Sequence, residues 1–148
     1  MAGAVFDAHE LDEFNKKMVK FYSREFPKET KKFMNQEGNE GRRILRRYTK
    51  ATTKKKTGNL MKGIDKGPAH KRGNDWQVRV RNKAPHAHLI EHGHGQHPGQ
   101  YVPAIGKRLT ADEVQGKHPA GRAQRAIAKW FTRDVEKWVD EMLKEGLR

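Results

Sequence analysis

Apolar side chains recur at steps of three and four residues in the first part of the chain. This stripe consists of Leu11, Phe14, Met18, Phe21 and Tyr22. Such spacing predicts an amphipathic helix, and Asp7 followed by Glu10 has the spacing of a capping box at its start. We expect Phe26-Pro27 to break or restart this helix, because Pro fits a first helical turn and the residue before it avoids the helical region.

A second helical pattern follows. Its apolar members are Phe33, Met34, Ile44, Leu45 and Tyr48. Gly38 and Gly41 lie inside it and should weaken it, because glycine costs helix stability. Together the two patterns predict a helical region over residues 7–50.

Basic side chains line the second helical pattern. They are Arg42, Arg43, Arg46, Arg47 and Lys50, and they fall mainly on the face opposite Ile44, Leu45 and Tyr48. A solvated helix flank explains such a run as well as a binding face does.

The periodicity then changes from helical to strand-like. Residues 51–59 have no period and predict a basic loop that ends in a turn at Gly58-Asn59; its lysines are Lys54, Lys55 and Lys56. We expect a strand over residues 60–64 and a second strand in which Trp76, Val78 and Val80 alternate with polar residues. Residues 66–75 are rich in turn formers and predict a long hairpin loop between them. The result is an antiparallel sheet region over residues 60–92, with Arg79 and Arg81 on its outer face.

The last third of the chain divides into a loop and a helix. Residues 93–121 hold six glycines and three prolines, which predicts a long Gly/Pro/His-rich loop over residues 93–118. The helical stripe after it consists of Ile127, Trp130, Phe131, Val135, Trp138, Val139, Met142 and Leu143. We expect a C-terminal helix over residues 119–146, with Gly146 as its stop. The predicted fold class is α+β: a single domain, residues 1–148, with long N-terminal and C-terminal helices packed on a small antiparallel sheet.

Positive charge is concentrated in the middle of the chain. The net charge is +14, and residues 41–83 contain fifteen Lys and Arg against only Asp65 and Asp75, which places about +13 in that segment. A one-sided field of this kind attracts a polyanion or an acidic partner.

Composition removes several classes of protein and site. The chain has no cysteine, which excludes disulfides, thiol catalysis and Cys-type zinc sites and agrees with a reducing compartment. No apolar run approaches the roughly 20 residues that a membrane span needs. The N-terminal residues lack the pattern of a secretory signal, so we expect a soluble protein without membrane contact.

Histidine is the residue type that invites a metal-site hypothesis. Five of the eight histidines lie between His86 and His97, and His88 with Glu91 or His92 could face the same way on a helical turn. The intervening glycines provide no rigid frame, and elsewhere there is no second cluster, only isolated histidines such as His70 and His118. We therefore expect no physiological metal and no cofactor. If the histidines bind nickel or zinc, we expect that binding to be adventitious.

Catalysis has little support in the sequence. A His with Glu91 could act in general acid/base chemistry, and a His/Glu metal-dependent hydrolase stays open as the weakest alternative. There is no G-x-S-x-G elbow, no phosphate-cradling loop and no set of carboxylates in the basic segment that a metal-dependent nuclease would need. We expect a protein that is not an enzyme.

Nucleic acid is the natural polyanion for the basic segment, because neutralised phosphates release counterions. No helix-turn-helix, zinc finger or aromatic RNA-binding strand is present. Tyr48 and Trp76 are better explained as core residues than as platforms for base stacking. A non-specific basic nucleic-acid-binding module is thus one alternative function, acting through backbone charge alone.

Three stretches of the chain carry a resemblance to a known family. They are KKTGNLMKGI, WQVRVRNKAPHAHLIEHGH and KHPAGRAQRAIAKWFTRDVEKWVDEML, over roughly residues 50–146. In these stretches the chain resembles the family of tailed-phage minor tail components that complete the tail and join it to the head. The matching positions are Thr57, Gly58, Asn59, Leu60, Asn82, Ala84, Pro85, Ala87, His88, Glu91 and Gly93. Their order and spacing make the resemblance specific, although none of them forms an active-site signature.

The resemblance implies an α+β subunit of the virion neck or tail, assembled in the host cytoplasm into a hexameric or related ring. The implied partners are a connector or stopper ring and a tail terminator or tail tube. Such a ring surrounds the DNA channel, so the basic side chains would meet the phosphate backbone or the acidic surfaces of neighbouring rings. The loop between His94 and Lys117 is long for this family, and its contacts are not implied by the resemblance.

Overall fold

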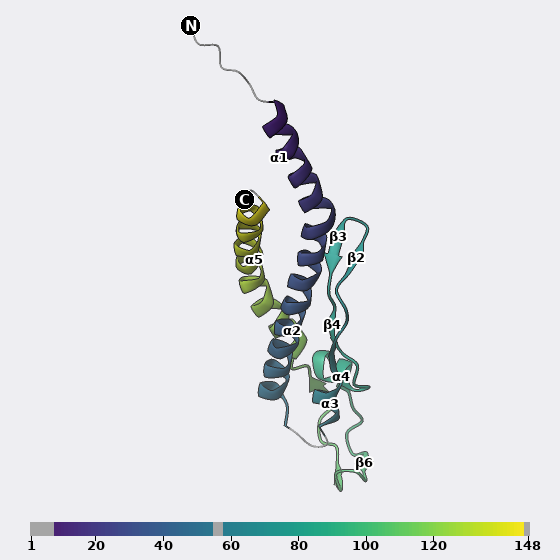
Figure 1. Ribbon diagram of the computed structural model, residues 1–148. Coiled ribbons are helices and arrows are strands. Elements are labelled where there is room, and N and C mark those ends of the chain that lie inside the picture. Colours follow the sequence, from purple (N-terminus) through teal and green to yellow (C-terminus); the bar gives the residue numbers. More distant parts are fainter. Residues whose placement is uncertain (1–7, 55–57, 147–148) are drawn as a thin grey trace.

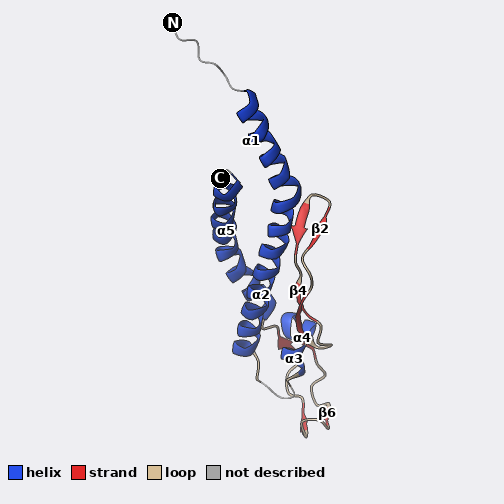
Figure 2. Ribbon diagram, in the orientation of Figure 1, coloured by secondary structure: helices blue, strands red, loops and turns tan. Residues whose placement is uncertain are grey.

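The computed structural model describes residues 8–54 and 58–146. Two long helices dominate it and lie side by side, while short strands and helices occupy one flank and one end (Figures 1 and 2). The first long helix comprises α1 (Ala8–Lys20), the π-helix η1 (Phe21–Glu25) and α2 (Phe26–Thr52). The second is α5 (Pro119–Gly146). The predicted α+β class with long terminal helices and small antiparallel sheets is confirmed.

Of the two alternatives for Phe26-Pro27, the break is wrong, whereas the restart is confirmed, because α2 begins at Phe26. Phe26 is itself helical, and its N–H bonds to the carbonyl of Phe21, five residues back. Pro27 then occupies the first turn of α2, where its missing N–H costs little. The π-helix therefore accommodates the proline without interrupting the helix, as such insertions do elsewhere. The predicted capping box involves Asp7, which lies outside the described residues.

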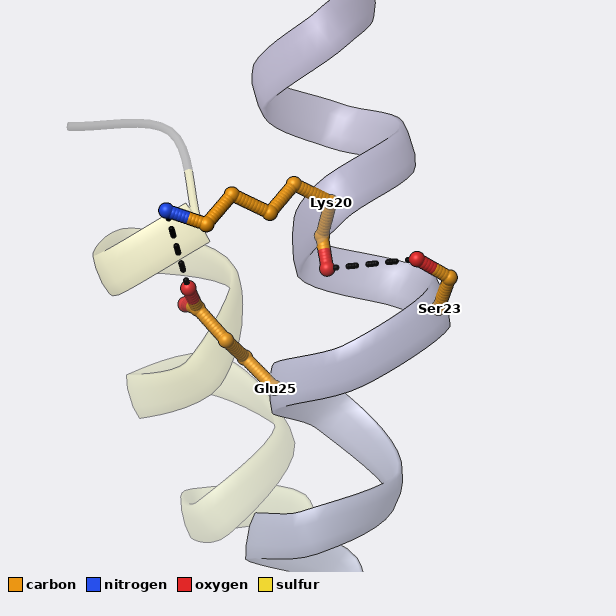
Figure 3. A network of polar contacts seen from close by, with 3 residues as sticks. All are labelled: Lys20, Ser23 and Glu25. Atoms are coloured by element: carbon orange, nitrogen blue, oxygen red, sulfur yellow. Dashed lines mark hydrogen bonds and ion pairs between the residues drawn. The ribbon is translucent and has the colours of Figure 1, made fainter.

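Lys20 directly precedes the π-helix, and Glu25 is its last residue. Their Nζ and Oε1 atoms are 4.0 Å apart, and the Ser23 hydroxyl donates a 3.5 Å hydrogen bond to the Lys20 carbonyl (Figure 3). Both charged side chains are exposed, so this pair adds little stability. The backbone continuity of α1, η1 and α2 is what extends α1 from the body.

Helices α2 and α5 pack antiparallel through an aromatic seam. The Phe33 and Trp138 rings stack with centroids 4.8 Å apart, and the Phe26 ring lies 5.4 Å from Trp138. Further along, Ile44, Leu45, Ile64 and Ala123 form a buried cluster. Tyr48 packs against this cluster, as expected for a core residue.

Two predictions for residues 60–82 are wrong in detail. Residues 59–62 form a helical turn, α3 (Asn59–Lys62), entered from Gly58 at φ 81°, so the first strand is only β1 (Ile64–Lys66). The predicted long hairpin loop contains a strand of its own. The strands concerned are β2 (His70–Arg72), β3 (Asp75–Gln77) and β4 (Val80–Asn82).

These four strands form one long antiparallel ribbon with an irregularity in its middle. Strand β1 pairs with β4, and β2 pairs with β3 through a two-residue turn at Gly73 and Asn74. Between the two ladders one strand has three residues and the other has two, which is the count of a β-bulge. The Gly67 N–H donates a 2.8 Å hydrogen bond to the Arg79 carbonyl across this gap. The bulge explains why the alternation from Trp76 to Val80 does not form one strand.

The predicted long loop before the last helix is also wrong, because it folds into a second ribbon. After α4 (Ala87–His92) come four short strands, of which the outer two and the inner two pair antiparallel. They are β5 (Gly93–Gly95), β6 (Tyr101–Val102), β7 (Lys107–Arg108) and β8 (Glu113–Gln115). The ribbon, hereafter the arm (residues 93–115), projects from the end of the molecule opposite α1 (Figure 1).

Two other boundaries also shift. Helix α2 runs two residues past the predicted end of the helical region and stops at Thr52, and Lys55, Lys56 and Thr57 lie outside the described residues. Across the described part of the chain, no helix is both long enough and apolar enough to cross a lipid bilayer.

Candidate interaction surfaces

The basic side chains of α2 form one exposed face, hereafter the α2 basic face (Arg42, Arg43, Arg46, Arg47 and Lys50). Arg42 is half-buried and the other four are exposed. The opposite side of the same turns is buried, through Ile44 and Leu45. The predicted segregation of charged and apolar side chains is therefore present in the structure.

Most of these cations have no carboxylate partner. Arg43 donates to Glu40 at 2.6 Å. Within the described residues, Arg46, Arg47 and Lys50 form no ion pair. Lys54 is exposed just beyond the helix end. Unpaired cations on one helix face keep their charge available to an external anion.

The ribbon carries the other two predicted cations, Arg79 and Arg81. Both are exposed. Arg81 lies opposite Asp65 in the β1–β4 ladder, and Asp65 is already paired with Lys83 at 2.5 Å. The hydrogen bond from Lys83 lowers the pKa of Asp65, and a backbone hydrogen bond from Lys66 lowers it further. The predicted basic set thus divides between the α2 basic face and the ribbon.

A groove of about 710 Å³, hereafter the α2 groove, opens between α2, the ribbon and α5. Gly38 and Gly41 of α2 are part of its lining, with Arg79 at the ribbon side. Its main apolar lining consists of Met34, Trp76, Val78, Ile127, Trp130 and Phe131. Trp76 is therefore a wall of the groove and only partly buried. Residue patterns could not reveal this groove, because its walls come from three separate parts of the chain.

Two polar atoms in this region lack hydrogen-bond partners within the described residues. They are Oε2 of Glu37 and Nε1 of Trp130, and both residues line the groove. Burial raises the pKa of Glu37, and the negative charges of Asp134 and Glu40 raise it further. A buried acceptor and a buried donor without partners cost free energy unless a ligand or partner satisfies them.

Two of the residues that carry the family resemblance connect neighbouring elements through side-chain hydrogen bonds. The Asn82 side chain donates to the Leu60 carbonyl at 3.1 Å and accepts from the Ala84 N–H at 3.0 Å. The Glu91 carboxylate accepts from the N–H groups of Ala120 and Gly121, at 2.8 and 2.9 Å. Glu91 therefore caps the start of α5, a role that the sequence pattern did not indicate.

Other motif positions have backbone explanations. Gly58 and Gly93 have φ angles of 81° and 78°, which disfavour any side chain. Gly93 also lies against the backbone of Val114 and Gly116, where a Cβ would clash. Ala84 is buried, Pro85 follows the end of β4, and His88 is exposed on α4.

The histidines do not gather into a metal site among the described residues, where no group of three or more His, Asp or Glu side chains could hold an ion. His86 precedes α4, His88 and His92 lie on it, and His94 lies on β5. The histidines that are close in the sequence are thus distributed over helix α4 and the arm.

Comparisons with known proteins give one match. Residues 12–93 correspond to the family described as "Bacteriophage HK97-gp10, putative tail-component". Neither the curated proteins nor the solved structures contain a match. The matched region includes most of the first long helix, the whole ribbon and α4, so the N-terminal helices belong to the likeness as much as the motifs around Gly58 and Asn82 do. Since this region spans more than half of the chain, the protein belongs to the HK97-gp10-like family of bacteriophage tail components.

Proposed function

We propose that this protein is a neck or tail-completion subunit, which forms a ring and joins the phage tail to the head connector. The observation that carries the proposal is the family match over residues 12–93. In this role the protein works by docking and not by chemistry. It reaches the virion after assembly in the host cytoplasm.

The α2 basic face supports this role. Arg46, Arg47 and Lys50 are exposed and have no ion-pair partner in the described chain. In a ring they would face the DNA backbone in the channel or acidic surfaces of a connector, stopper or tail-tube ring. Either partner would bind these cations without first breaking an ion pair within the subunit, which favours association.

The arm supplies a second contact region of different chemistry. Tyr101 and Ile105 at its tip are 53% and 47% exposed, and the basic residues Lys107 and Arg108 lie beside them. An exposed apolar and basic tip, far from the aromatic seam of α2 and α5, suits insertion into an adjacent ring.

Complementation of a phage or prophage that lacks this gene tests the proposal. The wild-type chain should restore joined heads and tails in negative-stain images. A chain with Arg46→Gln, Arg47→Gln and Lys50→Gln should leave heads and tails largely separate. A matched control, Lys137→Gln with Lys144→Gln on exposed positions of α5, should join them as the wild type does. Wild-type protein that leaves the particles unjoined would overturn the proposal.

The unpaired cations also favour the alternative of a free-standing, non-specific nucleic-acid-binding module. A salt titration of duplex DNA binding separates the two functions. Steep salt dependence in a chain that does not join particles would favour the alternative, because each phosphate contact releases counterions. Absence of binding at low salt would remove it.

A further inference from the structure

Helix α1 carries an apolar stripe that the other described elements leave largely exposed. Leu11, Phe14, Val19 and Tyr22 are 45%, 44%, 67% and 49% exposed. Helix α1 extends past the end of α5, whose Gly146 lies against the Phe21 ring (Figure 1). The stripe that packs on α5 through Phe21 and Phe26 thus continues along α1, where no other element of the described residues covers it. A contiguous apolar stripe of this kind marks an interaction site.

The continuous helix keeps α1 away from the α2 groove of its own chain. Helices α1, η1 and α2 follow one another without a break. The groove begins at Met34, further along the same helix. Since α1 cannot fold back onto α2 without melting the helix between them, a helix from another chain must fill the groove if a helix fills it at all.

The groove has the form of a site for a helix. Residues of α2, the ribbon and α5 line it together, with Met34 from α2, Trp76 and Val78 from the ribbon and Trp130 from α5. Amphipathic helices bind such grooves with apolar side chains at steps of three and four residues. Leu11, Phe14 and Met18 have that spacing.

Charge is complementary between the first turns of α1 and the ribbon wall of the groove. The first half of α1 has three carboxylates, Glu10, Asp12 and Glu13. The ribbon wall carries the exposed cation Arg79, and Lys71 is the cross-strand partner of the groove residue Trp76, which places both side chains on one face. An acidic helix and a basic wall attract each other and favour one orientation.

We propose that α1 of one copy binds in the α2 groove of a second copy. Its apolar stripe packs on Trp76, Val78 and Trp130, and its acidic first turns lie along the basic ribbon wall. The contact is head-to-tail, so every copy offers one α1 and one groove, and the chain of contacts closes when the rotation per copy allows a ring. This inference rests on the proposed function, for which it specifies the contact between subunits.

Cysteine crosslinking of the full chain tests the contact, because the wild-type chain contains no cysteine. Phe14→Cys places one thiol on α1, and Gln124→Cys places another on an exposed position of the groove lining. Mixing the two single variants under mild oxidation should give a crosslinked dimer that contains one chain of each. Replacing the second variant by Lys137→Cys, on an exposed position of α5 outside the groove lining, should abolish the crosslink.

No crosslink in the Phe14→Cys and Gln124→Cys mixture would overturn the proposal. Equally fast crosslinking of Phe14→Cys alone would overturn it too, because α1 helices would then pair with each other.

Charge reversal gives a second measurement that does not depend on a thiol. Glu13→Arg or Arg79→Glu alone should weaken self-association by about tenfold in sedimentation, the scale of a close interfacial charge pair. Both exposed positions tolerate substitution, and the double variant should recover most of the loss. Failure of the double variant to recover any affinity would contradict the predicted orientation.

The two proposals fail in different ways. Crosslinking without joining of heads to tails would remove the proposed function and leave the α1 contact intact. Joining by a Phe14→Glu variant that no longer self-associates would remove the contact and leave the proposed function.

Discussion

Gly38 and Gly41 show how two identical residues in one helix differ in their energetic role. A Cβ at Gly38 would lie 2.5 Å from Cγ2 of Val78 and 2.9 Å from Cδ of Lys66. A Cβ at Gly41 would lie 3.4 Å from Cγ2 of Val80 and 3.5 Å from Cδ1 of Ile127, which is ordinary contact. The ribbon can approach α2 closely only where the helix has no side chain.

We therefore expect Gly38→Ala to lower stability and Gly41→Ala not to lower it. Gly38→Ala should lower the free energy of unfolding by ~1–3 kcal/mol, because β-branched Val78 cannot move aside easily. Gly41→Ala should leave it unchanged or raise it by up to ~1 kcal/mol, since alanine favours the helix. Urea denaturation of both variants measures the difference. Equal effects would show that the ribbon is not held against α2 at Gly38.

Glu37 gives the protein a specific dependence of stability on pH. Burial, Asp134 and Glu40 raise the pKa of Glu37 above its ordinary 4.5 in the folded state. Between these two pKa values the folded chain binds more protons than the unfolded chain, so stability falls as pH rises through that window. Glu37→Gln should remove this fall and raise stability at neutral pH. Denaturation at a series of pH values measures it, with Glu136→Gln on an exposed turn of α5 as control. An unchanged pH slope in Glu37→Gln would contradict the assignment.

At the scale of elements, α1 and α2 of the first long helix have different energetic roles. Phe33 is buried and stacks on Trp138, whereas Phe14 is 44% exposed on α1. Phe33→Ala should cost ~3–5 kcal/mol of unfolding free energy, as expected for a lost core aromatic. Phe14→Ala should change it by less than ~0.5 kcal/mol, as surface substitutions do. A large loss in Phe14→Ala would mean that α1 packs on the body of its own chain.

Glu91 joins two elements that are distant in sequence. Its carboxylate accepts from the first N–H groups of α5, at Ala120 and Gly121. Glu91→Ala should lower the free energy of unfolding by ~1–2 kcal/mol, the usual cost of a lost helix cap. Glu91→Gln keeps one amide oxygen as an acceptor and should lose less. Equal stability of Glu91→Ala and wild type in urea denaturation would show that the cap contributes nothing.

Periodicity predicted the long helices well because each has one continuous apolar stripe. The ribbons were harder to predict, because strands of two or three residues are too short for alternation to show and the bulge after Lys66 shifts it by one position. In two places the glycines did not indicate the structure that forms. In the sequence Gly38 indicates a weak helix position, but in the structure it lets the ribbon pack closely on α2. The glycines of the arm indicate a loop in the sequence, because the ladders that they join have only two or three residue pairs. The α2 groove depends on contacts between distant segments and leaves no signal in sequence order.

At the scale of the whole molecule, positive charge is distributed very unevenly between the two long helices. On α2, Arg43 and Arg47 are four residues apart, as are Arg46 and Lys50, and like charges at this spacing repel. On α5, Lys137 and Lys144 lie within four residues of Glu141. The repulsion within the α2 basic face therefore lowers folding stability, whereas the exposed charges of α5 support their helix.

Neutralising each set of charges separates these roles. The Arg46→Gln, Arg47→Gln and Lys50→Gln chain should be more stable than wild type by ~0.5–1 kcal/mol at low ionic strength, since it loses several repulsive pairs. Added salt should shrink this gain, because it screens exposed charges. The Lys137→Gln and Lys144→Gln chain should instead be equally or less stable, because it loses attraction to Glu141. Urea denaturation at low and high salt measures both, urea being uncharged. A destabilised α2 variant would show that these cations have acidic partners within the subunit, and the α2 basic face would then have no charge to spare for DNA or for a neighbouring ring.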